Sequence, residues 1–191
     1  MSISDTIPNT PQENSPNKPA DIKEGNKSPE EKLRQEFLKR TFLVVEDHPN
    51  FGKFLITEIL KQRGVKRGKE DSGVILITNY QDFTSMVDRL FSGNPPANLL
   101  VILDLNFPNR QGDYIKDYGG EASEYIRNKI KNWNSEHLNQ QIILEIIMNS
   151  SNIDDMKKAQ AFGAVGFSKN KTEAVSAVKE LLLQKLETSS S

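Results

Sequence analysis

Short runs of apolar residues recur along this chain, separated by longer segments in which apolar and polar positions alternate with a different period. The runs are rich in branched side chains and contain few polar interruptions, which is typical of strands buried on both faces of a parallel sheet. They occupy residues 42–45, 74–77, 99–103, 142–148 and 164–168. We therefore predict five strands.

The segments between these runs carry apolar residues at every third or fourth position, as amphipathic helices do. The clearest example is 83–91, which ends before Gly93 and Pro95. The predicted helices cover about residues 50–63, 83–91, 122–133, 153–162 and 172–187. Strands that alternate with helices predict an α/β domain in which helices cover both faces of a parallel sheet.

The N-terminal part of the chain has a different composition. Prolines stand among polar residues at positions 8, 11, 16, 19 and 29, and few large apolar side chains accompany them. Such a segment cannot bury enough surface to offset its ordering entropy, so we predict disorder. Residues 29–40 have one thin apolar stripe, which favours a short solvated helix over a docking helix. The expected division is a disordered or partly helical tail at 1–40, a domain at 41–187 and a frayed end at 188–191.

Composition narrows the function classes. The chain has 191 residues, a net charge of −1 and no cysteine. This charge argues against direct nucleic-acid binding, which needs a basic surplus, and the lack of cysteine excludes disulfides and thiolate metal sites. No apolar run approaches the roughly 20 residues of a membrane span, and the N-terminus lacks a signal-peptide pattern. We expect a cytoplasmic protein with no membrane partner.

Carboxylates follow two of the predicted strands. Asp104 ends the run at 99–103, and Pro108 stops the strand from continuing. Glu46 and Asp47 follow the first run directly. Parallel strands present their carboxyl ends at one edge of the sheet, where ligands bind in such folds. If these two strands are neighbours, the three carboxylates form a site that suits Mg²⁺.

Phosphoryl transfer is one chemistry that such a site supports. A carboxylate can act as the nucleophile and become an aspartyl-phosphate, provided that cations neutralise the phosphoryl oxygens. Lys169 follows the last predicted strand and is a candidate cation. The segment 148–151 at the end of the fourth strand offers a hydroxyl donor.

These segments, taken in order, resemble the receiver domain of two-component response regulators. Glu46 and Asp47 resemble its acidic pair, residues 102–108 resemble its phosphoacceptor strand, and residues 163–169 resemble the segment that leads to its lysine. The resemblance covers about residues 41–186. It implies a CheY-like, flavodoxin-like fold with strand order 2-1-3-4-5.

The resemblance also implies roles for the acidic residues. Asp104 would accept a phosphoryl group from a histidine kinase or a phosphotransfer protein. Glu46, Asp47 and Asp104 would hold Mg²⁺, with the backbone carbonyl of Asn106 as a further ligand. These assignments compete with a plainer interpretation, in which a carboxylate at a strand end is only a turn residue or a helix cap.

The switch elements follow from the same resemblance. Lys169 would pair with the phosphoryl group, and Phe167 would be the aromatic that turns inward, although it could equally be a core residue. Ser150 is the first choice for the switch hydroxyl and Ser151 the second, whereas Asn149 would supply an amide instead. New charge at the site would pull the hydroxyl inward and make room for the aromatic.

Two features depart from the family pattern. Asn170 stands where the family usually has proline, which would position the neighbouring lysine less tightly. The segment after Asp104 is longer than usual, so the family's glycine could correspond to Gly112 or Gly120. The added residues, which include 114, 116 and 118, would cover the site or contact a partner.

The functional expectation is a single-domain response regulator that signals through a protein interface and is not a classical enzyme. Because the chain ends soon after the last predicted helix, we expect no output domain. The sequence does not identify the downstream target, and a homodimer is possible. The alternative is a pseudo-receiver that binds partners without phosphorylation. A third class, Mg²⁺-dependent phosphatases of the haloacid dehalogenase type, uses Asp-x-Asp-x-Thr, but Asn106 replaces the second carboxylate here.

Overall fold

The centre of the molecule is a sheet of five parallel strands, in the order β2-β1-β3-β4-β5. The computed structural model describes residues 27–65, 73–109, 111–113, 118–150, 155–168, 170 and 173–189. The strands are β1 (Thr41–Val45), β2 (Val74–Ile77), β3 (Asn98–Asp104), β4 (Ile143–Asn149) and β5 (Gly166–Ser168). The predicted strand order 2-1-3-4-5 is confirmed.

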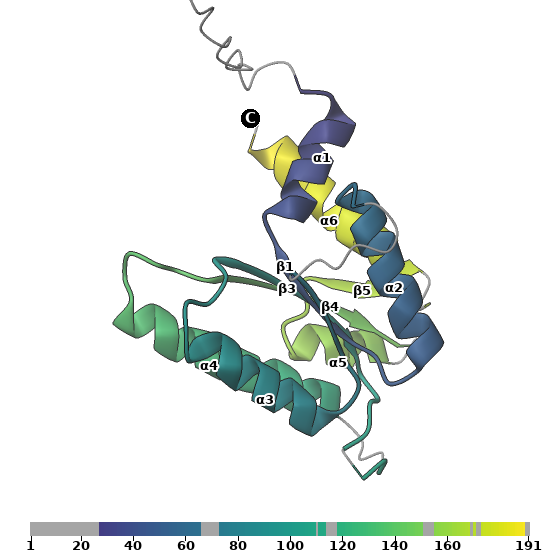
Figure 1. Ribbon diagram of the computed structural model, residues 1–191, viewed down its shortest axis with the longest axis vertical. Helices are drawn as coiled ribbons and strands as arrows, with labels where there is room; N and C mark the ends of the chain where they lie inside the picture. Colours follow the sequence, from purple (N-terminus) through teal and green to yellow (C-terminus); the bar gives the residue numbers. More distant parts are fainter. Residues whose placement is uncertain are drawn as a thin grey trace, which may run out of the picture.

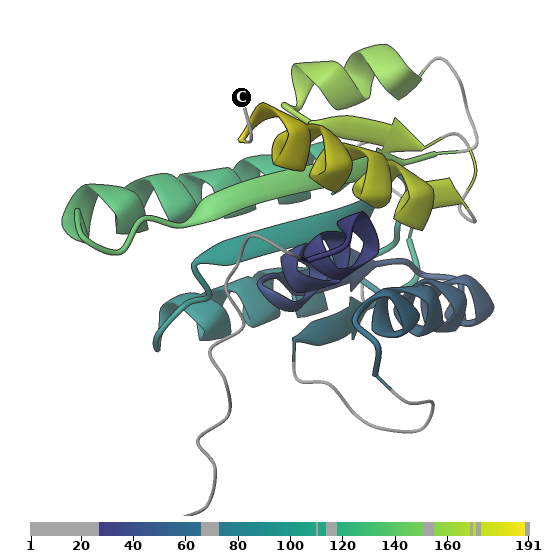
Figure 2. The same ribbon diagram turned by 90° about the horizontal axis from the view of Figure 1, so that it is seen from above.

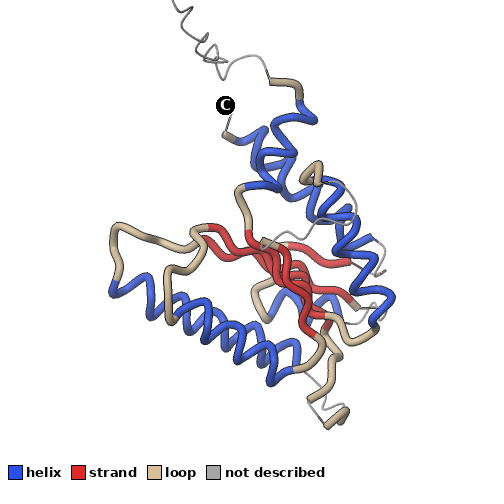
Figure 3. The backbone as a smooth tube through the Cα atoms, in the orientation of Figure 1, coloured by secondary structure: helices blue, strands red, loops and turns tan. Residues whose placement is uncertain are grey.

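Helices cover both faces of this sheet, as Figures 1 and 3 show, with the strands forming the middle layer. One face carries α3 (Tyr80–Phe91), α4 (Tyr118–Glu136) and α5 (Asp155–Ala161). The other face carries α1 (Pro29–Leu38), α2 (Pro49–Gln62) and α6 (Ala174–Thr188). None of the helices in the described residues combines the length and the apolar character needed to cross a membrane.

Alternation along the central strand β3 divides the core into two clusters. Val101 and Leu103 pack in the cluster beneath α3, α4 and α5, whereas Leu100 and Ile102 pack in the cluster beneath α1, α2 and α6. Successive side chains of a strand point to opposite faces, so a strand covered on both sides must be apolar at every position. This explains why the sequence of β3 is an uninterrupted apolar run that ends at a carboxylate.

The N-terminal helix α1 is part of the folded unit and not the solvated linker that its sequence favoured. Ser28 accepts a hydrogen bond from the Glu31 amide, and Pro29 begins the helix, so its start is well capped. Phe37 is fully buried and stacks on Phe42 of β1, with ring centroids 5.6 Å apart. Figure 2 shows α1 beside α6 and α2. Of the predicted tail at 1–40, residues 1–26 lie outside the described residues, so their disorder stays a prediction.

A buried ion-pair network holds α1 to the sheet. Arg40 Nε donates to Glu145 Oε2 of β4 at 2.7 Å, and Arg40 Nη1 reaches Glu36 Oε2 at 2.7 Å. Lys185 of α6 also pairs with Glu145. Burial raises the pKa of Glu145, but the hydrogen bonds from Arg40 and Lys185 outweigh it, so this pKa lies below its ordinary value. The carboxylate therefore stays ionised inside the protein.

Candidate functional site

Three predicted carboxylates meet at the carboxyl edge of the sheet. The pairing of Val45 with Leu103 places the residues that follow them, Glu46 and Asp104, side by side at the ends of β1 and β3. Glu46, Asp47 and Asp104 each offer one carboxylate oxygen, and these oxygens lie within 4.8 Å of one another. The strand order thus brings together acids that lie far apart in the sequence.

Backbone amides orient two of these carboxylates. The His48 amide donates to Glu46 Oε1 at 3.1 Å, and the Asn106 amide donates to Asp104 Oδ1 at 3.0 Å. Glu46 is fully buried, and Asp104 is 4% exposed. The acidic pair is followed by His48, the N-cap of α2, and by Pro49, which begins this helix and leads the chain away from the sheet. The two side chains are therefore fixed before any ligand arrives.

The donor set fits a hard divalent cation. Oxygen atoms are the ligands that Mg²⁺ prefers, and it is usually bound by one or two carboxylates together with water and phosphate oxygens. Like charges within 4.8 Å of one another also repel, most strongly where burial reduces solvent screening. A bound cation would relieve this repulsion.

Two predicted site residues lie outside the described residues. These are Lys169, the candidate cation, and Ser151, the second choice for the switch hydroxyl. Asn106 is described and exposed, and its amide contacts Asp104. The role of its backbone carbonyl as a metal ligand stays a prediction.

The two remaining switch candidates, Ser150 and Phe167, lie in the described part of the chain, and their switch roles stay predictions. Ser150 is buried, and its hydroxyl donates to Asp155 Oδ2 at the start of α5, at 2.5 Å. Phe167 of β5 is half-buried and packs against the core cluster beneath α3, α4 and α5. The residue that shares a register position with Asp104 is instead Asn149. The alternation of side chains along the fourth apolar run could have identified Asn149 as the residue on the same face as Asp104.

The connection after β3 packs closely on the first turn of α4. The Gly119 amide donates to the Leu105 carbonyl at 3.2 Å, and a Cβ at Gly119 would lie 2.7 Å from Leu105 Cα. Tyr118 stacks on Tyr80 with centroids 4.9 Å apart and lies near Phe107. α4 begins at Tyr118, so the last residues of the predicted loop are helical, and the insertion relative to the family stays a prediction.

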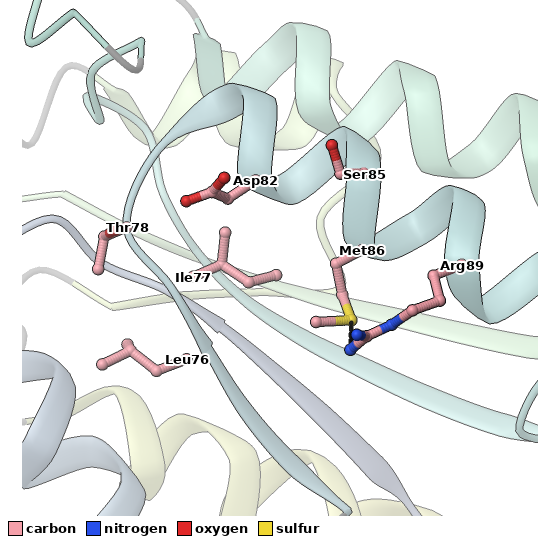
Figure 4. A pocket seen from close by; sticks show the side chains of 7 residues that line it. All are labelled: Leu76, Ile77, Thr78, Asp82, Ser85, Met86 and Arg89. Carbon is pink, nitrogen blue, oxygen red and sulfur yellow. Dashed lines mark hydrogen bonds between the residues drawn. The ribbon is translucent and has the colours of Figure 1, made fainter.

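A separate pocket of about 390 Å³ lies between β2 and α3. Figure 4 shows its lining, in which Arg89 reaches the sulfur of Met86 at 3.2 Å. The lining residues are Leu76, Ile77, Thr78, Asp82, Ser85, Met86 and Arg89. It contains none of the predicted site residues, so the acidic cluster and not this pocket is the candidate site.

Comparison with solved structures identifies the fold. The chain is similar to a variant of the receiver domain of the histidine kinase CKI1 from Arabidopsis thaliana, with 18% identity, a TM-score of 0.54 and coverage of 80% of this chain and 95% of that one. It is also similar to a CheY-like receiver domain protein from Methanospirillum hungatei, with 14% identity, a TM-score of 0.45 and coverage of 78% of this chain and 98% of that one. No protein-family model matches the sequence, and the search of curated proteins found no match. The chain has the receiver-domain fold that the sequence predicted.

Proposed function

We propose, from the receiver-domain fold and the acidic cluster together, that this protein is a response regulator that accepts a phosphoryl group on Asp104. Glu46, Asp47 and Asp104 would hold Mg²⁺. The observation that carries the proposal is the convergence of three carboxylate oxygens within 4.8 Å at the carboxyl edge of the sheet, where open α/β sheets bind their ligands.

Asp104 is the proposed nucleophile. One of its carboxylate oxygens attacks the phosphorus of a phosphohistidine on a kinase or phosphotransfer protein, so an O–P bond forms while the P–N bond breaks. The imidazole nitrogen keeps the electron pair of the broken bond and is protonated from solvent. The Asn106 amide, 3.0 Å from Asp104 Oδ1, fixes the orientation of the carboxylate during this attack. Bound Mg²⁺ would neutralise charge on the phosphoryl oxygens.

Other residues would complete the response. Lys169 would pair with the phosphoryl group, and the Asn106 carbonyl would be a further metal ligand. Phe167 lines a groove between β5 and α6 together with Ser168, Glu173 and Ala177 among others. A change in the position of this aromatic would alter the surface formed by α5, β5 and α6, which we propose as the interface for a downstream protein.

Phosphorylation with a small donor tests the proposal. Purified protein is incubated with acetyl phosphate and Mg²⁺, and the label is followed at acidic and basic pH. We expect an acid-stable, base-labile phosphate that is lost in Asp104→Asn. Asp88→Asn, which changes an exposed aspartate on α3, is the matched control and should be labelled like the wild type. Failure of the wild type to take up phosphate in the presence of Mg²⁺ would overturn the proposal.

The alternative is a pseudo-receiver that binds its partners without phosphorylation. One observation favours it, namely that the Ser150 hydroxyl donates a hydrogen bond to Asp155 Oδ2. Titration with Mg²⁺ separates the two functions, because a pseudo-receiver that has lost the metal site does not bind the ion. Turnover of a generic phosphate ester in the same samples would point to a phosphatase.

A further inference from the structure

Asn149 is a buried polar residue at the carboxyl end of β4. It is 1% exposed, and within the described part of the chain neither its Oδ1 nor its Nδ2 has a hydrogen-bond partner. An amide that is removed from water without partners is destabilising, and such groups are rare in native proteins. Its presence calls for a ligand that satisfies it.

The strand register directs this side chain to the acidic cluster. Asn149 pairs with Asp104 of β3 on one side and with Ser168 of β5 on the other. Two residues earlier in β3 and β4, Ile102 and Ile147 belong to the same core cluster. Side chains two residues apart point to the same face of a strand, so Asn149 and Asp104 share a face.

The neighbouring hydroxyls serve other groups. Ser150 follows Asn149 and therefore points to the opposite face, where it donates to Asp155 at 2.5 Å. The Ser168 hydroxyl donates to the Asn170 carbonyl at 2.5 Å. Among Asn149, Ser150 and Ser168, only Asn149 has side-chain donors that make no hydrogen bond, and these donors can bind a group on Asp104.

We infer that the Asn149 carboxamide, and not a serine hydroxyl, is the β4 group that contacts the phosphoryl group on Asp104. This inference rests on the proposed function. Nδ2 carries two N–H donors, and hydrogen bonds to a charged acceptor are stronger than those between neutral groups. The amide would therefore stabilise the phosphorylated state and do little for the site when only a cation is bound.

The experiment compares Asn149→Leu, which has a similar volume and no polar atoms, with Ser150→Ala. The probes are beryllofluoride with Mg²⁺, as an analogue of the phosphoryl group, and acetyl phosphate. We expect Asn149→Leu to weaken beryllofluoride binding and shorten the half-life of the phosphorylated protein, each by about tenfold. Ser150→Ala should bind beryllofluoride like the wild type.

Two further measurements separate contact with the phosphoryl group from a structural role. Asn149→Leu should bind Mg²⁺ alone with unchanged affinity and, without ligand, should unfold at an equal or higher urea concentration than the wild type, because it removes an unsatisfied amide. Asn149→Ser should recover at least half of the lost half-life. A structural role would instead lower stability and affect both ligands.

The outcomes distinguish this inference from the proposed function. If the wild type takes up neither phosphate nor beryllofluoride, the proposed function and the inference both fail. If Asp104→Asn loses the label while Asn149→Leu keeps wild-type half-life and affinity, only the inference fails. Loss of beryllofluoride binding in Ser150→Ala with retention in Asn149→Leu would restore the serine as the switch residue.

Discussion

Two clusters of buried acidic residues lie on the same sheet and have opposite characters. Glu145, in the middle of β4, is surrounded by opposite charges from its own chain, namely Arg40 and Lys185. At the carboxyl edge, the carboxylates of Glu46, Asp47 and Asp104 converge. Two of them, Glu46 and Asp104, accept hydrogen bonds from backbone amides. Both clusters bury carboxylates, so burial of charge alone does not identify a functional site.

The difference lies in what completes each cluster. The Glu145 network joins α1, β4 and α6 and needs nothing from outside, which is the arrangement expected of a structural ion pair. In the edge cluster, three carboxylates lie close together where the chain turns away from the sheet. A divalent cation bound there would reduce the repulsion between them. We therefore predict that a Glu→Gln substitution lowers the free energy of unfolding at Glu145 and raises it at Glu46.

The largest effect is expected in the structural network. Glu145→Gln removes the more deeply buried of the two carboxylates that pair with Arg40 and should lower the free energy of unfolding by about 3 kcal/mol. Urea unfolding followed by circular dichroism measures this loss. The double substitution Arg40→Met with Glu145→Leu removes both charges and should recover most of the stability. A double variant as unstable as Glu145→Gln would show that packing, and not charge pairing, sets the loss.

Mg²⁺ should stabilise the folded protein through the edge cluster alone. At an ion concentration 100 times the dissociation constant, linkage raises the free energy of unfolding by about 2.7 kcal/mol. Thermal unfolding with and without Mg²⁺ should show this increment in the wild type and in Glu145→Gln, and not in Glu46→Gln. An equal increment in all three proteins would place the metal elsewhere.

A smaller effect on the free energy of unfolding, of opposite sign, is expected when one charge of the edge cluster is removed in the absence of metal. Glu46→Gln removes one of three neighbouring negative charges and should raise the free energy of unfolding by about 1 kcal/mol in the presence of EDTA. The measurement is the urea midpoint, with Glu58→Gln, which changes a partly exposed acid on α2, as the control. Destabilisation by Glu46→Gln would mean that its carboxylate serves the fold and not a ligand.

The smallest effect near neutral pH concerns the ionisation of Glu145. Because its pKa in the folded state is lower than the ordinary value of 4.5, its contribution to stability is complete above pH 4.5 and is lost as the pH falls through the lower folded-state pKa. The urea midpoint of the wild type should therefore change little between pH 7 and about 5.5 and then fall. Glu145→Gln should lose stability less steeply in the acid range. Parallel curves for both proteins would exclude this carboxylate as the source.

Much of the fold follows from local patterns. The apolar runs predicted β1, β2 and β3 within a residue or two, because a strand buried on both faces must be apolar at nearly every position. The end of β4 was placed one residue too early, at Met148, whereas the strand continues through Asn149. That residue's face therefore went unrecognised, and the adjacent hydroxyl of Ser150 was preferred.

The packing of α1 could not be predicted in the same way. Its apolar stripe, which includes Leu33 and Phe37, is as thin as that of a solvated helix, and propensity does not separate the two. The helix packs on the domain because Phe37 is buried in the core cluster that α2 and α6 also line. In addition, Arg40 pairs with Glu145, which lies more than a hundred positions away in the chain. No local pattern contains these partners.

The sequence by itself determined which segments are strands and that acids follow two of them, because side-chain periodicity and strand endings are local properties. The strand order came from a family resemblance, which the tertiary structure confirms. Only the tertiary structure showed that the acids of β1 and β3 meet within 4.8 Å and that Asn149 shares a face with Asp104. Strand order and register depend on how all the helices pack together against both faces of the sheet, and each strand's own residues leave them open.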